Sequence, residues 1–295
     1  MKNVYMMLKN VWIFAFAAFM MSCGEQTNKN DTEMTETEVT VDSLLHFRNQ
    51  NIKTDYLSRN FPDLEREKAA ELQLAVLKKE LDGGAVLAGW KMGGTVGDSA
   101  SFDPLMGYML KANEHFPGDK ISIKKFPGSE VMIEGEVGFV FKQDFPNGVT
   151  SIEELKNGID YAVGAIEFAQ SNAIGIDNNP ETANTNHVLA FGLGQAGFLL
   201  GNTKIDFADF NVAEEAVECF IDGEKAASGV SSRIYGGHLN ALNALVNMLP
   251  KYGLMIKKGD VVITGSMYAN PTVTGSAKVN LQFSSLGEIQ LEILD

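Results

Sequence analysis

Short runs of alternating apolar and polar residues, separated by glycine and proline, dominate the chain from residue 85 to its end. Successive side chains of a β-strand point to opposite faces, so this alternation predicts strands. We expect strands in the runs 85–92, 119–126, 130–141, 215–227, 259–265, 277–283 and 288–294. The run 198–207 predicts a further strand and turn.

Residues 61–84 carry a helical pattern instead. Asp63 is a candidate N-cap, and Gly83 and Gly84 are expected to end the helix. The apolar residues near one stripe of this helix are Leu64, Leu72, Ala75 and Leu81.

Two later segments also predict helices. Residues 151–170 open with Ser151 and Glu154 at the spacing of a capping box, and residues 239–253 repeat apolar side chains every three or four positions. With 45% apolar residues, the chain can bury a sizeable core. The fold class is therefore α+β and β-rich, with a domain at 85–295 behind a small helical segment at 44–84.

The N-terminus predicts a secreted, lipid-anchored protein. Residues 1–22 combine two lysines with an apolar run too short to span a bilayer, as in a signal peptide, and Cys23 follows as in a bacterial lipobox. Cleavage before Cys23 and its acylation would place the protein in the cell envelope, on the periplasmic side or at the outer membrane. An ordinary signal peptide with an incidental cysteine is the alternative. Residues 23–43 are polar and acidic, which predicts a disordered tether.

Charge and cysteine content exclude two classes of protein. The formal net charge is −14, which repels phosphate backbones, so we expect no nucleic-acid partner. Besides Cys23 the chain holds only Cys219, which predicts a buried thiol and no fold-determining disulfide.

Two acids interrupt the most strand-like run of the chain. In 130–141, Glu134 and Glu136 lie two positions apart, so they share one face of the strand, opposite the apolar face expected in the core. Two ionised carboxylates at this short separation repel each other, and a divalent cation bound by both removes the repulsion. The alternative is a solvated sheet face with two harmless acids.

A third isolated acid, Glu167, stands between apolar residues in the sequence GAIEF. A cluster of carboxylate oxygens favours a hard ion, Mg²⁺ or Mn²⁺. The histidines are scattered without the spacing of zinc ligands: His46, His115, His187 and His238.

The three acids, together with several motifs that follow one another along the chain, resemble features of the 2-keto-4-pentenoate hydratases in the fumarylacetoacetate-hydrolase-like superfamily. MIEGEV followed by Glu167 resembles the family's metal site, and AGWKMGGT resembles its lysine strand, with Lys91 at the lysine. The resemblance continues in Ser228-Gly229, GGHLNAL and KKGDVVITGS, and it covers roughly residues 44–295.

The resemblance implies a mixed β-roll or sandwich with a metal held by Glu134, Glu136 and Glu167. Lys91 would assist an anionic substrate and, with a lowered pKa in its apolar strand, would shuttle protons. A surface lysine at a strand edge is the alternative. Weaker substrate contacts are implied for Ser228, His238, Thr264 and Asp103, although the motifs around His238 and Asp103 depart from the family's pattern.

The implied function is a metal-dependent lyase of aromatic catabolism, which hydrates a 2-hydroxyalka-2,4-dienoate to a 4-hydroxy-2-oxo acid. The expected partners are a small 2-oxo acid, further copies of the chain in a homo-oligomer, and the membrane through the lipid anchor only. An acylpyruvate-type C–C hydrolase, a 2-oxo acid decarboxylase and a non-catalytic carboxylate-binding lipoprotein stay open. The dinucleotide-like pattern GLGQAG at 192–197 precedes a predicted strand, not a helix, so it predicts a turn.

Overall fold

Two long antiparallel strands form the middle of a curled, mixed sheet. The computed structural model describes residues 35–295, so the predicted signal peptide and Cys23 lie outside the described residues. The larger sheet has eight strands in the order β2-β1-β10-β5-β6-β7-β3, with β11 paired to β5. Its strands are β1 Leu87–Gly93, β2 Leu105–Leu110, β3 Glu114–His115, β5 Val131–Phe141, β6 Ile159–Ala169, β7 Gln195–Asp206, β10 Val261–Ile263 and β11 Thr272–Val273.

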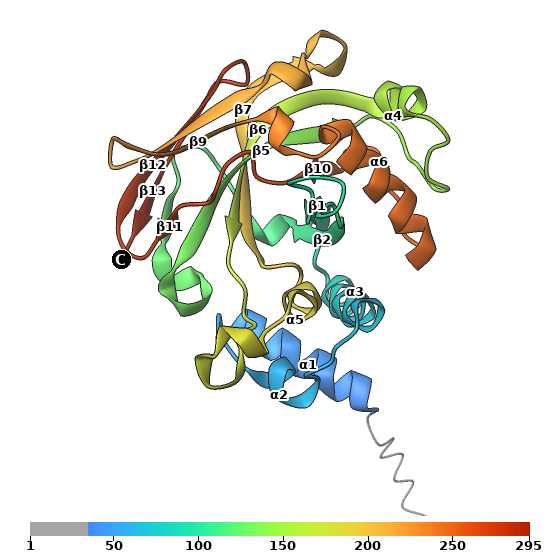
Figure 1. The fold of residues 1–295 in the computed structure, drawn as a ribbon, viewed down its shortest axis with the longest axis vertical. Helices are drawn as coiled ribbons and strands as arrows, with labels where there is room; N and C mark the ends of the chain where they lie inside the picture. Colours follow the sequence, from blue (N-terminus) through green and yellow to red (C-terminus); the bar gives the residue numbers. More distant parts are fainter. Residues whose placement is uncertain (1–34) are drawn as a thin grey trace, which may run out of the picture. The chain divides into compact units, whose positions relative to one another are not determined.

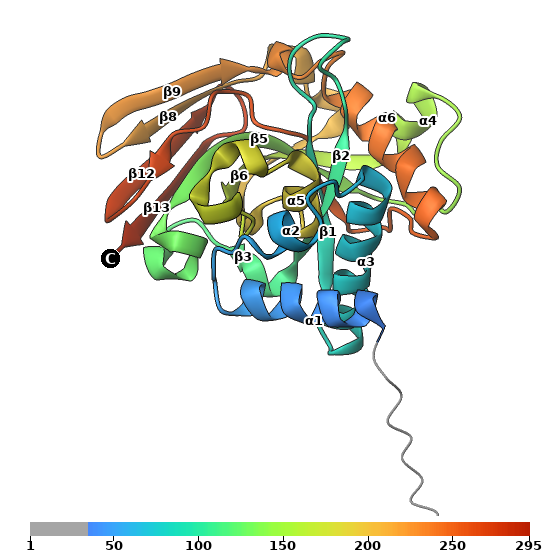
Figure 2. The ribbon, with the colours of Figure 1, turned by 60° about the horizontal axis from the view of Figure 1, so that its bottom comes forward.

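A second sheet of five strands packs against the larger one (Figures 1 and 2). Its order is β4-β13-β12-β8-β9. Its strands are β4 Lys120–Ser122, β8 Ala216–Ile221, β9 Glu224–Val230, β12 Ala277–Phe283 and β13 Glu288–Leu294. The predicted β-rich α+β fold with a roll or sandwich of sheets is confirmed.

The helices gather in two places (Figure 1). Helices α1, α2, α3 and α5 form one group, while α4 contacts α6 beside the larger sheet. Their bounds are α1 Glu36–Asn49, α2 Tyr56–Asn60, α3 Arg66–Asp82, α4 Ile152–Gly158, α5 Thr185–Ala190 and α6 His238–Met248. Among the helices of residues 35–295, none is long and apolar enough to cross a membrane.

The two faces of β5 divide the sheet as its alternation predicts. Val131, Ile133, Val137, Phe139 and Phe141 are fully buried in the main core, which also takes side chains from the second sheet and from α6. The opposite face carries Glu134 and Glu136, beside a small separate apolar cluster. Members of that cluster include Ala88, Met109, Val140, Ala165, Phe198, Val261 and Ile263.

The helix predicted for 151–170 is wrong over most of its length. Ser151 does cap a helix, since its side chain accepts a hydrogen bond from the Glu154 N–H, but α4 ends at Gly158. Residues 159–169 form β6, buried on both faces over most of its length. A strand covered on both sides has an almost continuously apolar sequence, which the alternation test cannot distinguish from a buried helix.

Helix α3 also differs from its prediction. It begins at Arg66 after an N-cap at Glu65, so Asp63 is not the cap, and it ends before Gly83 as expected. Leu72 is buried but Leu81 is 37% exposed, because the buried stripe of α3 runs through Ala69, Leu72, Val76 and Leu77, and the helix packs on α1 and α5.

Other strand boundaries also shift. The run 119–126 supplies only the three residues of β4 before it turns, and 215–227 contributes to a hairpin of β8 and β9 rather than one strand. The turn predicted at 192–197 is confined to 192–194, and the strand predicted from 198 begins earlier, as β7 at Gln195. Cys219 is a buried free thiol, as predicted.

The predicted tether is too long at its C-terminal end. Helix α1 begins at Glu36, where the Thr35 side chain and the Glu38 carboxylate form a capping box. Thr40, Val41 and Leu44 of this helix are buried against α2, α3 and α5. Residues 36–43 therefore belong to the folded unit, Thr35–Asp295.

Replacement of Leu44 by alanine tests whether α1 is part of this unit. Leu44 is fully buried, so Leu44→Ala should lower the free energy of unfolding by about 2–5 kcal/mol. Val39 of the same helix is 44% exposed, and Val39→Ala should change it by less than about 0.5 kcal/mol. Urea titration followed by circular dichroism measures both, and equal effects would contradict the packing of α1.

Candidate metal and active site

The pairing of β5 with β6 brings the three acids together. Glu134 lies directly opposite Glu167 across the ladder, and Glu136 lies two residues further along β5 on the same face. One carboxylate oxygen from each acid lies within 4.8 Å of the other two. The distances among the three carboxylates, which the sequence alone did not give, are thus short enough for all three to bind one ion.

Glu136 and Glu167 are fully buried and Glu134 is half-buried, so a solvated sheet face is excluded. Glu136 Oε2 accepts a hydrogen bond of 2.6 Å from the Gly265 N–H, and Glu134 Oε1 accepts one of 2.7 Å from Asn270 Nδ2. Glu136 Oε1 and Glu167 Oε2 have no hydrogen-bond partner. Buried carboxylate oxygens without a partner are costly unless a ligand satisfies them.

The electrostatics of the group lead to the same conclusion. Burial and the adjacent Glu167 carboxylate raise the pKa of Glu134 to about 7. Burial, with Glu167 and Glu134 close by, also raises the pKa of Glu136 well above its ordinary value. A divalent cation would favour the charged forms, because its attraction opposes both effects.

Lys91 extends from β1 to this group. Its side chain is buried, its Nζ forms an ion pair with Glu167, and Nζ also donates a hydrogen bond of 2.9 Å to the Leu193 carbonyl. The surface-lysine alternative is therefore excluded. Burial disfavours the ammonium, but Glu167, Glu134 and Glu136 outweigh it and hold the pKa of Lys91 above its usual range. The predicted lowering of this pKa is thus wrong, because the sequence did not show three carboxylates around the amine.

A strained turn presents the Leu193 carbonyl to Lys91. Gly192, Leu193 and Gly194 all have positive φ, at 82°, 58° and 70°. Leucine rarely adopts this region, and such strain persists only where surrounding contacts hold it. A Cβ added at Gly192 would lie 3.8 Å from the guanidinium carbon of Arg48 from α1, and Arg48 pairs with Tyr108 and Glu80.

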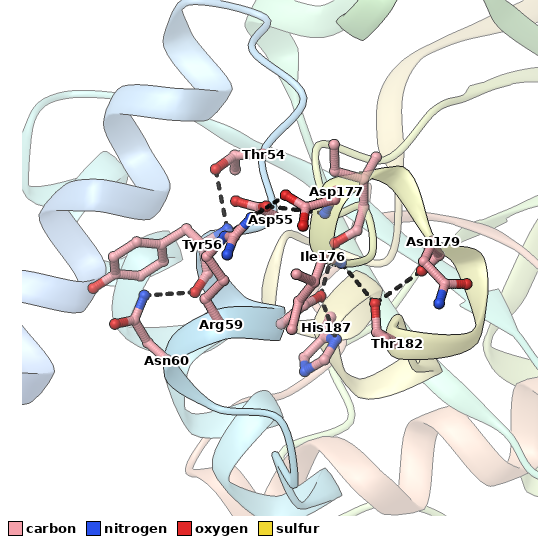
Figure 3. Close-up of polar contacts among 12 residues, drawn as sticks. Thr54, Asp55, Tyr56, Arg59, Asn60, Ile176, Asp177, Asn179, Thr182 and His187 are labelled. Atoms are coloured by element: carbon pink, nitrogen blue, oxygen red, sulfur yellow. Dashed lines mark hydrogen bonds and ion pairs between the residues drawn. The ribbon is translucent and has the colours of Figure 1, made fainter.

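The segment that leads to this turn, residues 170–194, is fastened to α2 (Figure 3). Arg59 of α2 pairs with Asp55 and with Asp177, which also has positive φ. Nε2 of the buried His187 donates a hydrogen bond of 2.8 Å to the Phe61 carbonyl, and its Nδ1 lies 3.3 Å from Ser58 Oγ. The N-terminal helices therefore help to position the carbonyl that binds Lys91.

The side chains of the other predicted site residues form no hydrogen bond or ion pair with the three acids in the described chain. Asp103 is largely exposed and forms an ion pair with Arg66, and Ser228 is exposed on β9 in the second sheet. Thr264 and His238 are buried and bonded to each other, with 2.6 Å between Thr264 Oγ1 and His238 Nδ1. Burial lowers the pKa of His238 to about 4, so its imidazole is neutral. Substrate contacts by these four residues stay predictions.

Sequence analysis missed three groups that hold the site. They are the N–H of Gly265, the amide of Asn270 and the carbonyl of Leu193. Two are backbone atoms, which leave no chemical signal in a sequence. The only clue in the sequence to the Gly265 N–H was the presence of Gly265 in the motif KKGDVVITGS.

One cavity is lined by residues close in sequence to Glu167 and Leu193, although the three acids and Lys91 do not line it. This cavity of about 470 Å³ is lined in part by Arg48, Lys125, Gln170 and Gln195. Gln170 lies three residues from Glu167, and Gln195 lies two residues from Leu193. The volume of this cavity falls in the range of small-molecule sites.

The donor set fits a hard divalent cation. Three carboxylates with unsatisfied oxygens converge, and oxygen ligands are those that Mg²⁺ and Mn²⁺ prefer. We therefore regard Glu134, Glu136 and Glu167 as the residues that would hold the ion.

Comparison with curated proteins finds distant homology to hydratases. The chain is 22% identical over 243 residues to 2-hydroxyhexa-2,4-dienoate hydratase from Comamonas testosteroni, which covers 81% of this chain and 90% of that protein. It is 22% identical over 240 residues to 2-keto-4-pentenoate hydratase from Paraburkholderia xenovorans, covering 80% and 87%. The chain is a distant homologue of these hydratases. No family model matches it.

Solved structures share the fold. The 4-oxalocrotonate decarboxylase from Pseudomonas putida G7, complexed with magnesium and adipate, aligns with a TM-score of 0.77 at 19% identity, over 88% of this chain and 99% of that one. A fumarylacetoacetate hydrolase from Exiguobacterium antarcticum aligns with a TM-score of 0.55 at 14% identity, over 71% and 74%. The predicted relationship of fold is confirmed.

Removal of the ammonium tests the electrostatic balance of the site. Without metal, Lys91→Met should lower the free energy of unfolding by about 3–5 kcal/mol, because it leaves the buried Glu167 carboxylate unpaired. Lys111→Met is the matched control, since Lys111 pairs with Glu114 at the surface and should contribute at most about 1 kcal/mol. Urea titration in EDTA measures both.

Addition of Mn²⁺ should restore part of the stability of Lys91→Met, because the ion replaces the lost positive charge. A loss no larger than that of Lys111→Met would show that Lys91 does not neutralise this group.

Proposed function

We propose that this protein is a divalent-metal-dependent lyase that hydrates a 2-hydroxyalka-2,4-dienoate to a 4-hydroxy-2-oxo acid. The observation that carries the proposal is the convergence of Glu134, Glu136 and Glu167 beside the buried ammonium of Lys91. The hydratases among its distant relatives support the same reaction class.

A bound Mg²⁺ or Mn²⁺ would polarise the 2-oxo group and stabilise negative charge on its oxygen. Lys91 supplies the other half of the chemistry. Its Nζ is held between Glu167 and the Leu193 carbonyl, so it presents a proton at a fixed point. Proton transfer between Lys91 and the substrate would assist the change from dienol to keto form before water adds.

The charges of the site suit a carboxylate substrate. Three ionised carboxylates are balanced in formal charge by one ammonium and one divalent ion, so an anion is not repelled. Arg48 and Lys125 line the neighbouring cavity and would attract the substrate carboxylate. The apolar cluster on the same face of the sheet excludes water and strengthens these interactions.

Decarboxylation of a 2-oxo acid is a second candidate, favoured by the fold shared with 4-oxalocrotonate decarboxylase. Hydrolysis of an acylpyruvate and non-catalytic binding of a carboxylate are further candidates, which the same substrate panel distinguishes. We also propose that the chain forms a homo-oligomer.

A substrate panel tests the reaction. The full chain with Mn²⁺ should remove the ultraviolet absorbance of 2-hydroxyalka-2,4-dienoates and form a 4-hydroxy-2-oxo acid without releasing carbon dioxide. Glu136→Gln keeps the size of the side chain but removes a charged ligand, so it should lose Mn²⁺ binding and turnover together.

Different products would identify different reactions. Release of carbon dioxide from a 2-oxo acid would replace the proposal by a decarboxylase, and cleavage of an acylpyruvate would replace it by a hydrolase. Mn²⁺ binding without turnover of any substrate would leave a carboxylate-binding protein.

We further propose that Cys23 is acylated and anchors the protein in the cell envelope. The support is the lipobox-like sequence at residues 1–23. Cys23→Ala should abolish incorporation of labelled palmitate and move the protein to the aqueous phase of a Triton X-114 partition. Cys219→Ala should change neither, and persistent labelling of Cys23→Ala would refute the anchor.

A further inference from the structure

A chain of buried polar groups lies behind Glu136. The Gly265 N–H that donates to Glu136 Oε2 belongs to the peptide between Thr264 and Gly265. The Thr264 side chain meets His238 Nδ1 at 2.6 Å, and His238 Nε2 meets Ser231 Oγ at 3.1 Å. Thr264, His238 and Ser231 are each at most 2% exposed. The chain therefore leads from Glu136 to Ser231 through groups shielded from solvent.

One arrangement of protons uses every contact of this chain. In it, Ser231 Oγ donates toward the sulfur of Met267 at 3.7 Å and accepts from the N–H at His238 Nε2. His238 Nδ1 then carries no proton and accepts from the hydroxyl of Thr264. Both ring nitrogens of His238 thus have hydrogen-bond partners inside the protein.

The peptide after Thr264 is held from a second side. Thr95 Oγ1 donates a hydrogen bond of 2.9 Å to the Thr264 carbonyl. Gly265 has φ of +115°, and a Cβ at this position would lie 2.2 Å from Thr95 Oγ1. The orientation of the Gly265 N–H thus depends on two contacts of Thr264, one through its carbonyl and one through its hydroxyl.

We propose that His238 is a positioning residue for the metal site, which acts through Thr264 to aim the Gly265 N–H at Glu136. The inference rests on the metal site of the proposed function and assigns His238 a role behind that site. Because Glu136 Oε2 is occupied by this donor, Oε1 is the oxygen left for the ion. Partners that orient a metal ligand typically change metal affinity when they are removed.

The main experiment measures the Kd for Mn²⁺ by calorimetry on the full chain, in the absence of substrate. His238→Phe keeps a planar ring but removes both nitrogens, and it should weaken Mn²⁺ binding by about 10-fold or more. Thr264→Val removes the hydroxyl with little change of shape and should act similarly. Thr264→Ser keeps the hydroxyl and should bind Mn²⁺ within about threefold of the unaltered chain.

Adjacent serines provide a matched control. Ser231 is buried against His238, while Ser232 is exposed. Ser231→Ala should weaken Mn²⁺ binding measurably and Ser232→Ala should not.

Hydrogen exchange gives a readout that is independent of metal. The amide of Gly265 should exchange faster in Thr264→Val than in Thr264→Ser, as measured by mass spectrometry of the metal-free chain. An unchanged Kd and exchange rate in Thr264→Val would overturn the proposal even if His238→Phe fails to fold. A merely structural role of His238 would lower the melting temperature with the Kd unchanged.

These outcomes are distinct from failure of the proposed reaction. A chain that binds Mn²⁺ in this pattern but converts no substrate would refute the lyase and support the role of His238. A chain that does not bind Mn²⁺ at all would overturn both.

Discussion

Repulsion among three closely spaced carboxylates, two of them fully buried, is the constraint on which the site depends. Glu134, Glu136 and Glu167 lie on one face of a sheet that is otherwise packed with apolar side chains, where desolvation opposes their charge. Lys91 and the Gly265 N–H offset part of this cost, and two carboxylate oxygens are left without a partner. A hard cation would relieve the remaining imbalance of charge.

Much of the fold around the site serves to keep these charges in place. The register of β5 with β6 sets the separation of Glu134 and Glu167. The Leu193 carbonyl binds Lys91, and the segment that leads to this carbonyl is bonded to α2 through Arg59 and Asp177. One short segment of chain therefore connects the N-terminal helices with the buried ammonium.

Sequence patterns predicted β5 and its two faces correctly, because alternation over 11 residues is a strong local signal. They failed for β6, whose covered faces make it apolar throughout, and so Glu167 was assigned to a helix although it lies on a strand. The prediction that Asp63 is the N-cap was wrong because residues 61–64 form a turn, and α3 begins only after Glu65. The predicted lowering of the Lys91 pKa was wrong because the carboxylates around its amine come from strands distant in the sequence.

The sequence by itself determined that Glu134 and Glu136 share a face opposite the core, since strand geometry alone requires it. It also determined the acid types, and with them the preference for a hard ion. Only the tertiary structure decided that Glu167 lies opposite Glu134, that Lys91 reaches it, and that His238 is bonded to Thr264 behind the site. These pairings join segments far apart in sequence, and strand register and side-chain packing across the whole sheet select them together.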